Sequence, residues 1–161
     1  MRSTPRVVGS VLALVTALVL PLLGSSASAS AGATARTWQL EKWDLPQRMC
    51  VLHNSGDGVH RSYLIFAVTG QWSTDLDFGM RDLPPGWTAL QSHLPPGSNH
   101  PDPDDGGVMV NGWISVQGPT SVPMGVYRPL IWVSDGVVTD TAAVEIVVST
   151  ASWLECMQDR G

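Results

Sequence analysis

Short apolar, β-branched stretches alternate along most of this chain with clusters of glycine, proline, asparagine and aspartate. After residue 29, no segment carries a hydrophobic stripe of 3.6-residue period that is long enough for a helix. Alternation of this kind, with turn signals between the apolar stretches, is typical of an all-β sandwich or barrel. The sequence therefore predicts an all-β domain.

Turn residues separate the expected strands. The stretch 59–68 is apolar on both of its alternating faces, so we expect a central strand there. Prolines at 84–85 and 95–96 remove backbone donors and therefore end strands, and the polar stretch 98–107 is the longest expected loop. The other expected strands cover residues 38–43, 47–53, 71–78, 108–110, 113–116, 126–133 and 137–148.

Two tight hairpins are expected in the second half of the chain. Asn111-Gly112 lies between apolar flanks, and Asn-Gly in that setting is the strongest short-range signal for a hairpin. Asp135-Gly136 marks a second turn between two apolar strands. The segment from Trp153 to Cys156 is expected to add a short terminal strand or to dock through a disulfide.

Six short motifs follow one another along the chain. They are N-S-G-D at 54–57, L-P-P-G-W at 83–87, L-P-P-G at 94–97, P-M-G-V-Y at 123–127, V-S-D-G at 133–136 and V-E-I-V-V at 144–148. Over these 95 residues the chain resembles the immunoglobulin-like sandwich modules that accompany bacterial extracellular glycosidases and surface proteins. The resemblance implies an immunoglobulin-like β-sandwich of about seven or eight strands.

The same resemblance implies a non-catalytic spacer or binding module. The whole chain is also similar to small, stand-alone secreted actinobacterial proteins of unknown function, which implies no activity. Two features depart from the pattern of the modules: Asn111-Gly112 interrupts an expected strand, and residues 98–107 form an insertion.

Cys50 and Cys156 are the only cysteines. In an oxidising compartment a small, even number of cysteines usually forms structural disulfides, and two cysteines allow one pairing. The bridge would close a loop of 107 residues. On the chain-entropy model such a loop stabilises by about 4 to 5 kcal/mol. Two free buried thiols are the alternative.

Residues 1–29 have the pattern of a secretory signal peptide. Two arginines precede an apolar run at 7–23, and small residues with A-x-A sites follow. Cleavage is expected after Ala29 or Ala31, which leaves 30–161 as one secreted, extracellular domain. A membrane anchor is the alternative, but the run is shorter than the roughly 20 residues that a span needs, and no basic stop-transfer cluster follows.

The formal net charge of −5 becomes about −7 once the two arginines of the leader are removed, because all 14 acidic residues follow it. An acidic surface with scattered arginines repels phosphate backbones and anionic lipids. Nucleic acids and membranes are therefore poor partners. The expected partner is an extracellular protein or glycan, and a monomer is expected.

The sequence assigns no catalytic residue, cofactor or metal ligand. The acidic loop from Asp102 to Asp105 suggests calcium, but the EF-hand pattern fails at its fifth position, Gly106, and at its twelfth, Trp113. The four histidines lack the spacing of zinc ligands, and no G-x-S-x-G elbow is present. A secreted hydrolase or inhibitor is therefore a less favoured alternative.

The chain contains seven tryptophans, and this high number is the feature of its composition that most strongly suggests a binding role. Flat amphipathic rings stack on sugar faces, and exposed aromatic side chains mark binding sites, although a small sandwich also fills its core with such rings. Trp87 follows a P-P-G turn and Trp113 follows Asn111-Gly112, so both are expected to reach solvent. Trp132 lies within a strand and is expected in the core. The sequence thus predicts a non-catalytic secreted binding module of unknown ligand, with a carbohydrate-binding module acting through Trp87 and Trp113 as the alternative.

Overall fold

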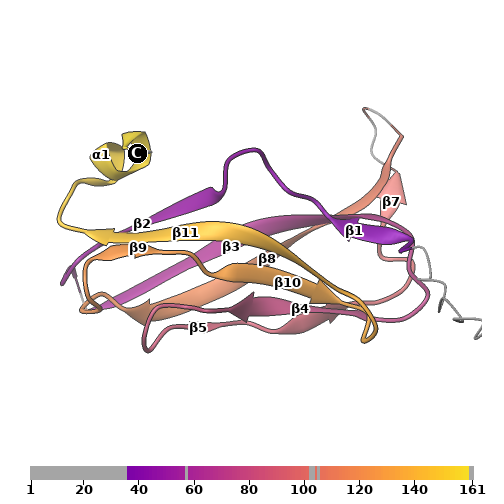
Figure 1. Ribbon diagram of the computed structural model, residues 1–161, viewed down its shortest axis with the longest axis horizontal. Helices are drawn as coiled ribbons and strands as arrows, with labels where there is room; N and C mark the ends of the chain where they lie inside the picture. The colour runs from indigo at the N-terminus through magenta and orange to yellow at the C-terminus, as the bar shows by residue number, and fades with distance from the viewer. Residues whose placement is uncertain (1–35, 57, 102–103, 105, 160–161) are drawn as a thin grey trace, which may run out of the picture. The chain divides into compact units, whose positions relative to one another are not determined.

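Two β-sheets pack face to face in the computed structural model (Figure 1). The chain divides into two units, Met1–Ala33 and Thr34–Gly161, and the described residues all belong to the second. The expected leader and its cleavage sites lie outside the described residues. The prediction of an all-β domain is confirmed. The structure describes residues 36–56, 58–101, 104 and 106–159.

Most of the described chain is in strands, and one short helix follows the last of them. The first sheet contains β1 (Trp38–Leu40), β3 (Val59–Gly70), β5 (Thr88–Ala89), β7 (His100–Pro101) and β8 (Val108–Pro119). The second sheet contains β2 (Gln47–Leu52), β4 (Leu76–Arg81), β6 (Ser92–Leu94), β9 (Gly125–Tyr127), β10 (Leu130–Ser134) and β11 (Thr139–Ser149). The helix is α1 (Trp153–Gln158).

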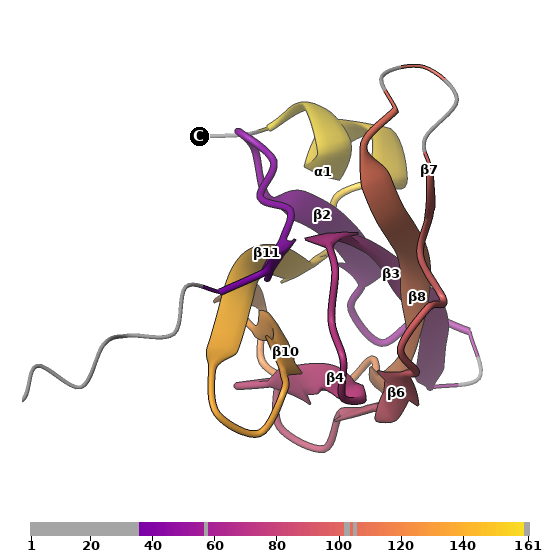
Figure 2. The same cartoon turned by 90° about the vertical axis from the view of Figure 1, so that its right-hand side faces the viewer.

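The strand order is that of an immunoglobulin-type sandwich. The first sheet runs β1-β3-β8-β5 and the second β2-β11-β10-β4-β6. Immunoglobulin domains place strands A, B, E and D in one sheet and C, F and G in the other. The two orders agree when β1, β3, β8 and β5 are A, B, E and D, and β4, β10 and β11 are C, F and G. The expected immunoglobulin-like sandwich is therefore confirmed, and Figure 2 shows β3, β7 and β8 on one side with β10 and β11 on the other.

On both sides of the sandwich the chain switches between the two sheets. β2 leaves the first sheet after β1 and pairs in parallel with β11. On the other side, β5 pairs with β8, β6 pairs with β4, and β7 returns to β8. The described residues hold more strands than the seven or eight expected because this second edge is broken into short pieces.

The core lies between the inner faces of the two sheets. Its fully buried side chains come from alternate positions of the long strands, as period-two patterning requires. Phe66 and Phe78 face each other across the core with ring centroids 4.8 Å apart. The largest of the fully buried side chains in this core are Phe66, Leu76, Ile114, Ile131 and Ile146.

β8 is continuous, so the hairpin expected at Asn111-Gly112 is wrong. Gly112 pairs with Phe66 in the middle of the β3–β8 ladder. A Cβ at this glycine would lie 2.5 Å from Cζ of Phe66, so the residue provides room for the aromatic ring in place of a turn. The second expected hairpin is confirmed, because β10 pairs with β11 across Asp135-Gly136.

The expectation of a central strand at 59–68 is confirmed, whereas the expectation that Trp132 lies in the core is wrong. β3 lies between β1 and β8, and Leu64, Phe66 and Val68 on its inner face are buried. Tyr63 and Ile65 on the outer face are 63% and 50% exposed. Trp132 lies on the outer face of the second sheet and is half-buried. A Cβ at Gly79 on the neighbouring strand β4 would lie only 2.9 Å from Cζ2 of Trp132. The indole therefore fits over β4 because position 79 is a glycine.

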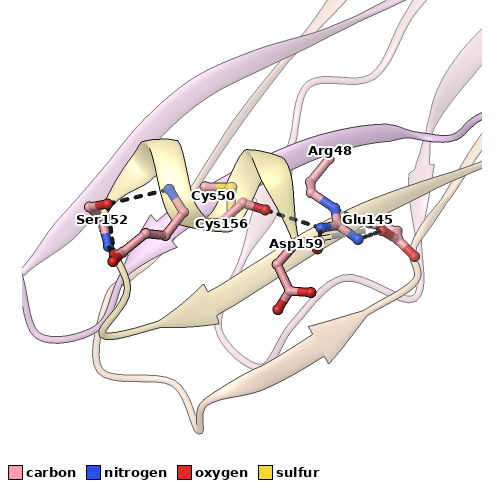
Figure 3. Close-up of a disulfide and its surroundings, with 7 residues drawn as sticks. Arg48, Cys50, Glu145, Ser152, Cys156 and Asp159 are labelled. Atoms are coloured by element: carbon pink, nitrogen blue, oxygen red, sulfur yellow. Dashed lines mark hydrogen bonds and ion pairs between the residues drawn. A yellow bond between two sulfur atoms is a disulfide. The ribbon is translucent and has the colours of Figure 1, made fainter. Parts of the chain in front are cut away.

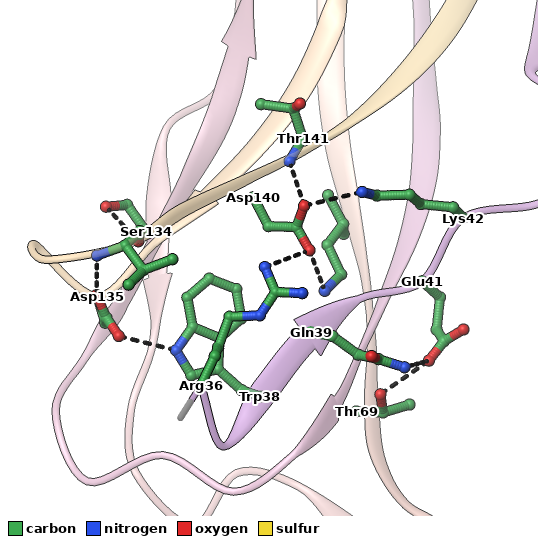
Figure 4. Close-up of polar contacts among 12 residues, drawn as sticks. Arg36, Trp38, Gln39, Glu41, Lys42, Thr69, Ser134, Asp135, Asp140 and Thr141 are labelled. Carbon is green, nitrogen blue, oxygen red and sulfur yellow. Dashed lines mark hydrogen bonds and ion pairs between the residues drawn. The ribbon is translucent and has the colours of Figure 1, made fainter. Parts of the chain in front are cut away.

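The start of the domain is held to the β10–β11 hairpin by the buried carboxylate of Asp140 and its partners (Figure 4). The carboxylate of Asp140 lies 2.9 Å from Nη1 of Arg36 and 3.1 Å from Nζ of Lys42, and it accepts hydrogen bonds from the amides of Leu40 and Thr141. Burial alone would raise the pKa of Asp140. The hydrogen bonds from Lys42 and from these amides, together with the charge of Arg36, lower the pKa by more than burial raises it. The net pKa is below its ordinary value.

The end of the domain is fixed by a disulfide and by one arginine (Figure 3). Cys50 and Cys156 form the expected bridge, which is confirmed. Arg48 donates to the carbonyls of Cys156 and Asp159. The segment expected as a strand or docked loop is α1, because Ser152 and Glu155 form a capping box at its N-terminus. No helix in the described part of the chain is long and apolar enough to cross a membrane.

Candidate binding surface

Trp87 is a core residue, so the expectation that it reaches solvent is wrong. Its side chain is 6% exposed, and its Nε1 donates to the carbonyl of Pro119 at 3.2 Å. A Cβ at Gly118 would lie 2.2 Å from its Cγ, so the indole rests directly on this glycine. The reason is the preceding turn: the amide of Trp87 donates to Pro84, and the turn folds the ring back into the sandwich.

Trp113 is exposed, as expected. It is 65% exposed on the outer face of β8, while its neighbour Ile114 is fully buried. In the antiparallel ladder it lies directly opposite Ile65, and Tyr63 is diagonal to it on the same face. Side chains at such positions contact each other. We call Tyr63, Ile65 and Trp113 the aromatic face.

The surroundings of the aromatic face are mainly polar and uncharged. The outer face of β8 carries three more exposed side chains at alternate positions on either side of Trp113, namely Asn111, Ser115 and Gln117. A hollow of about 480 Å³ adjoins them, and its lining residues include Arg61, Thr88, Leu90, Ser115 and Gln117. The arrangement offers flat rings beside amide and hydroxyl groups that can form hydrogen bonds.

The strand edge beside the aromatic face is covered by Gln47. Its side-chain amide forms hydrogen bonds with both the N–H and the carbonyl of Ile65. A ligand that approaches this face therefore meets side chains first, because the backbone groups of Ile65 already have partners.

A second hollow, of about 420 Å³, lies under α1 and is lined by charged groups that pair with one another. Arg48 lies 2.7 Å from Glu145, and Arg128 lies 3.5 Å from the same carboxylate. The hydrogen bond from Arg48 is the main cause that lowers the pKa of Glu145, against a smaller opposing effect of burial. These charges hold the helix in place and leave this hollow a weaker candidate for a ligand.

No group of metal-ligating side chains is found among residues 36–56, 58–101, 104 and 106–159. Most of the acidic loop, namely residues 102, 103 and 105, lies outside the described residues. His60 stacks on the core residue Trp87 with ring centroids 5.8 Å apart. Burial lowers the pKa of His60, so its ring is neutral at pH 7.

Tyr63 and Ile65 were not expected in a site. Their positions could have been found from the alternation of β3, because Leu64, Phe66 and Val68 form the more uniformly apolar face and place the other face outward. Trp153 was not expected either. It is 66% exposed on α1, a helix that the sequence pattern did not indicate.

A family profile described as "Family of unknown function (DUF5980)" matches residues 39–150. None of the curated proteins matches the chain. Among solved structures, the chain is similar to the ASH/PapD-like domain 7 of human CEP192, with 9% identity, a TM-score of 0.33, and coverage of 72% of this chain and 87% of that one. It is also similar to the Vibrio cholerae VesB protease, with 13% identity and a TM-score of 0.33; the match covers 68% of this chain but only 31% of the protease.

Proposed function

The chain belongs to the DUF5980 family of unknown function, and from that premise we propose that it is a non-catalytic, secreted binding module that holds its ligand on the aromatic face. The function of this family is unknown, so the match itself assigns no activity, catalytic or otherwise. The proposal therefore rests on the surface of the molecule and on the compartment that its disulfide favours.

The observation that carries the proposal is the contiguity of the aromatic face. Tyr63, Ile65 and Trp113 are each at least half exposed and are neighbours in the β3–β8 ladder. Single exposed apolar side chains are normal on proteins, whereas contiguous ones mark interaction sites. Trp and Tyr are also the residues that most often dominate binding energies.

The chemistry around Trp113 favours an uncharged, extended glycan over a charged ligand. The rings supply flat apolar surface for the faces of sugars. Asn111, Ser115 and Gln117 supply neutral hydrogen-bonding groups beside them. The acidic net charge of the chain disfavours polyanions. The carbohydrate-binding alternative is thus retained through Trp113, without Trp87.

We further propose that residues 1–29 are removed on export, with cleavage after Ala29 or Ala31. The Cys50–Cys156 disulfide supports an oxidising compartment. N-terminal sequencing of protein from the culture medium should begin at Ser30 or Gly32. A retained Met1 in a membrane fraction would contradict export. The association with extracellular glycosidases and the actinobacterial source stay hypotheses from the sequence resemblance.

Binding is tested by titrating soluble chitin, cellulose and peptidoglycan fragments and following tryptophan fluorescence. Trp113→Ala should weaken binding roughly thirtyfold, which corresponds to a loss of about 2 kcal/mol at a central aromatic contact. Trp43→Ala is the matched control, because Trp43 is 44% exposed but lies outside the aromatic face. Equal affinity of wild type and Trp113→Ala, or no binding of any fragment by the wild type, would overturn the proposed glycan function.

A further inference from the structure

A groove of about 440 Å³ lies where the two sheets separate, between β2 and β3 and beside α1. It forms because β2 pairs with β11 of the second sheet, so that the edge of β3 opposite β8 is left without a neighbouring strand beyond β1. Its volume is in the range of pockets that hold small organic ligands. Its walls include Gln47, His60, Tyr63, Trp153 and Met157.

Tyr63 joins this groove to the aromatic face. This residue lines the groove and lies diagonal to Trp113 in the ladder. Trp153, on α1, also lines the groove and is 66% exposed. Exposed rings therefore follow one another from Trp113 through Tyr63 to Trp153.

The chemistry of the groove is neutral. Arg48 is its only charged wall residue, and this guanidinium is paired with Glu145 at 2.7 Å and with the carbonyls at the end of α1. The remaining polar side chains are an amide, a hydroxyl, a phenol and an imidazole. A phosphate or carboxylate would find no free cation there, whereas a hydroxylated, uncharged ring would find both flat surface and hydrogen-bonding groups.

His60 supplies a second, independent observation. It lines this groove and an adjoining hollow of about 270 Å³, and both spaces are also bounded by Cys50 and Trp153. Its Nε2 is buried and has no hydrogen-bond partner in the described structure. Buried polar groups are nearly always paired. Nδ1 of His53 is buried and unpaired in the same way. Because Nε2 of His60 has almost no accessible surface, a ligand hydroxyl in the groove can pair with it only when the imidazole turns toward the groove.

A peptide strand is a poorer occupant. Such a strand would bind by pairing with the backbone of β3. At Ile65, however, the side chain of Gln47 already takes both backbone hydrogen bonds, so a peptide would have to displace it. The groove thus favours a ligand that binds by ring contacts and hydroxyl groups.

We infer that the groove binds one sugar ring of an extended neutral glycan, held between Tyr63 and Trp153 above His60, while further rings of the same chain lie on Trp113. This inference rests on the proposed function and adds to it a second subsite and a minimum ligand length. Tyr63, Trp153 and His60 become binding residues, and affinity depends on the number of sugar units.

The test compares neutral oligosaccharides from disaccharide to hexasaccharide, of whichever glycan the wild type binds, by calorimetry. Trp153→Ala should weaken hexasaccharide binding at least about tenfold, and affinity should no longer rise with chain length. Leu154→Ala is the matched control, because Leu154 is 58% exposed on the same helix but does not line the groove. Near-ultraviolet circular dichroism and thiol labelling verify that each variant keeps its fold and its disulfide.

A second measurement keeps the inference testable if Trp153→Ala disturbs α1. The imidazole resonances of His60 in the wild type should shift on saturation with the hexasaccharide, and those of exposed His93 should not. If Trp113→Ala loses binding while Trp153→Ala keeps it and His60 does not shift, the groove subsite is wrong and the aromatic face stands. If Trp113→Ala also keeps full affinity, the proposed function itself is wrong. Competition by an extended peptide in place of the glycan would overturn the ligand class.

Discussion

The side-chain amide of Gln47 takes the place of a neighbouring strand beside Ile65. Its Nε2 donates to the carbonyl of Ile65 at 2.6 Å, and its Oε1 accepts from the amide of Ile65 at 3.0 Å. This pairing occurs beyond β1, which contacts only the last residues of β3. Gln47 therefore closes the edge of the first sheet at the point where its own strand, β2, has joined the second sheet.

Gln47→Ala should free both backbone groups of Ile65 and make the edge of β3 available to another chain. Exposed strand edges are templates for intermolecular pairing. We expect a loss of stability of about 1 to 2 kcal/mol in urea unfolding, together with concentration-dependent dimers in sedimentation analysis. The amide of Ile65 should also exchange faster with deuterium.

Gln47→Glu is the control for this prediction. A carboxylate can still accept from the amide of Ile65 but cannot donate to its carbonyl, so intermediate behaviour is expected. A Gln47→Ala variant that stays monomeric and keeps the wild-type exchange rate at Ile65 would show that the amide contact does not protect the edge.

The parts of the fold that depend on local pattern could be predicted from the sequence. Asp135-Gly136 between two apolar strands gave the β10–β11 hairpin, and two cysteines allowed only one bridge. Asn111-Gly112 carries an equally strong local signal but lies inside β8. The difference depends on Phe66, which needs the space at Gly112 and is far away in the sequence. Local pattern cannot show such a contact.

Only part of the candidate site could be predicted, because its other residues are oriented by contacts between distant parts of the chain. Trp113 was expected to reach solvent because it follows Asn111-Gly112, but no turn forms there, and the residue is exposed because it lies on the outer face of β8. Trp87 has an equally loop-like neighbourhood, but its direction is set by Gly118 and His60 on other strands. The groove beside Trp153 depends on β2 changing sheets, which no motif marks.

Gly112→Ala should destabilise the fold because the added methyl group would meet the ring of Phe66. The ideal Cβ would lie 2.5 Å from Cζ of that ring, and overpacking of this kind costs about 1 to 3 kcal/mol. Asn111→Ala is the matched control, since Asn111 is exposed and should tolerate the change. Adding Phe66→Leu to Gly112→Ala should recover part of the loss in thermal unfolding. Equal stability of Gly112→Ala and wild type would contradict the contact.

Removal of the Cys50–Cys156 bridge should destabilise the domain by about 2 to 5 kcal/mol, because the unfolded chain gains freedom over a separation of 106 residues. The double variant Cys50→Ala, Cys156→Ala tests this by urea unfolding. Arg48 still holds the carbonyls of α1 in that variant, so Arg48→Ala added to it should release the helix. Native, non-reduced protein should show no labelling by thiol reagents; labelling of two thiols would refute the bridge.

Asp140 should make the stability of the domain depend on pH in the acid range. Its carboxylate is 8% exposed and interacts with Arg36 and Lys42. Burial opposes ionisation, but the hydrogen bonds from Lys42 and from the amides of Leu40 and Thr141, with the charge of Arg36, bring the pKa below its ordinary value. A group whose folded-state pKa is lowered stabilises the fold above its unfolded pKa, near 3.9 for aspartate, and this contribution is lost as the pH falls through the folded value.

Asp140→Asn keeps the size of the side chain and one acceptor but removes the charge. At pH 7 it should be less stable than the wild type by about 1.5 to 3 kcal/mol, the usual range for hydrogen bonds to a charged group. As the pH is lowered from about 4, the wild type should lose stability faster than the variant, so the gap between them should narrow. Asp77→Asn is the control, because Asp77 is exposed on β4 and should give no such gap. A difference between wild type and Asp140→Asn that stays constant from pH 7 to pH 3 in thermal unfolding would show that the ionised carboxylate does not hold the start of the domain to the β10–β11 hairpin.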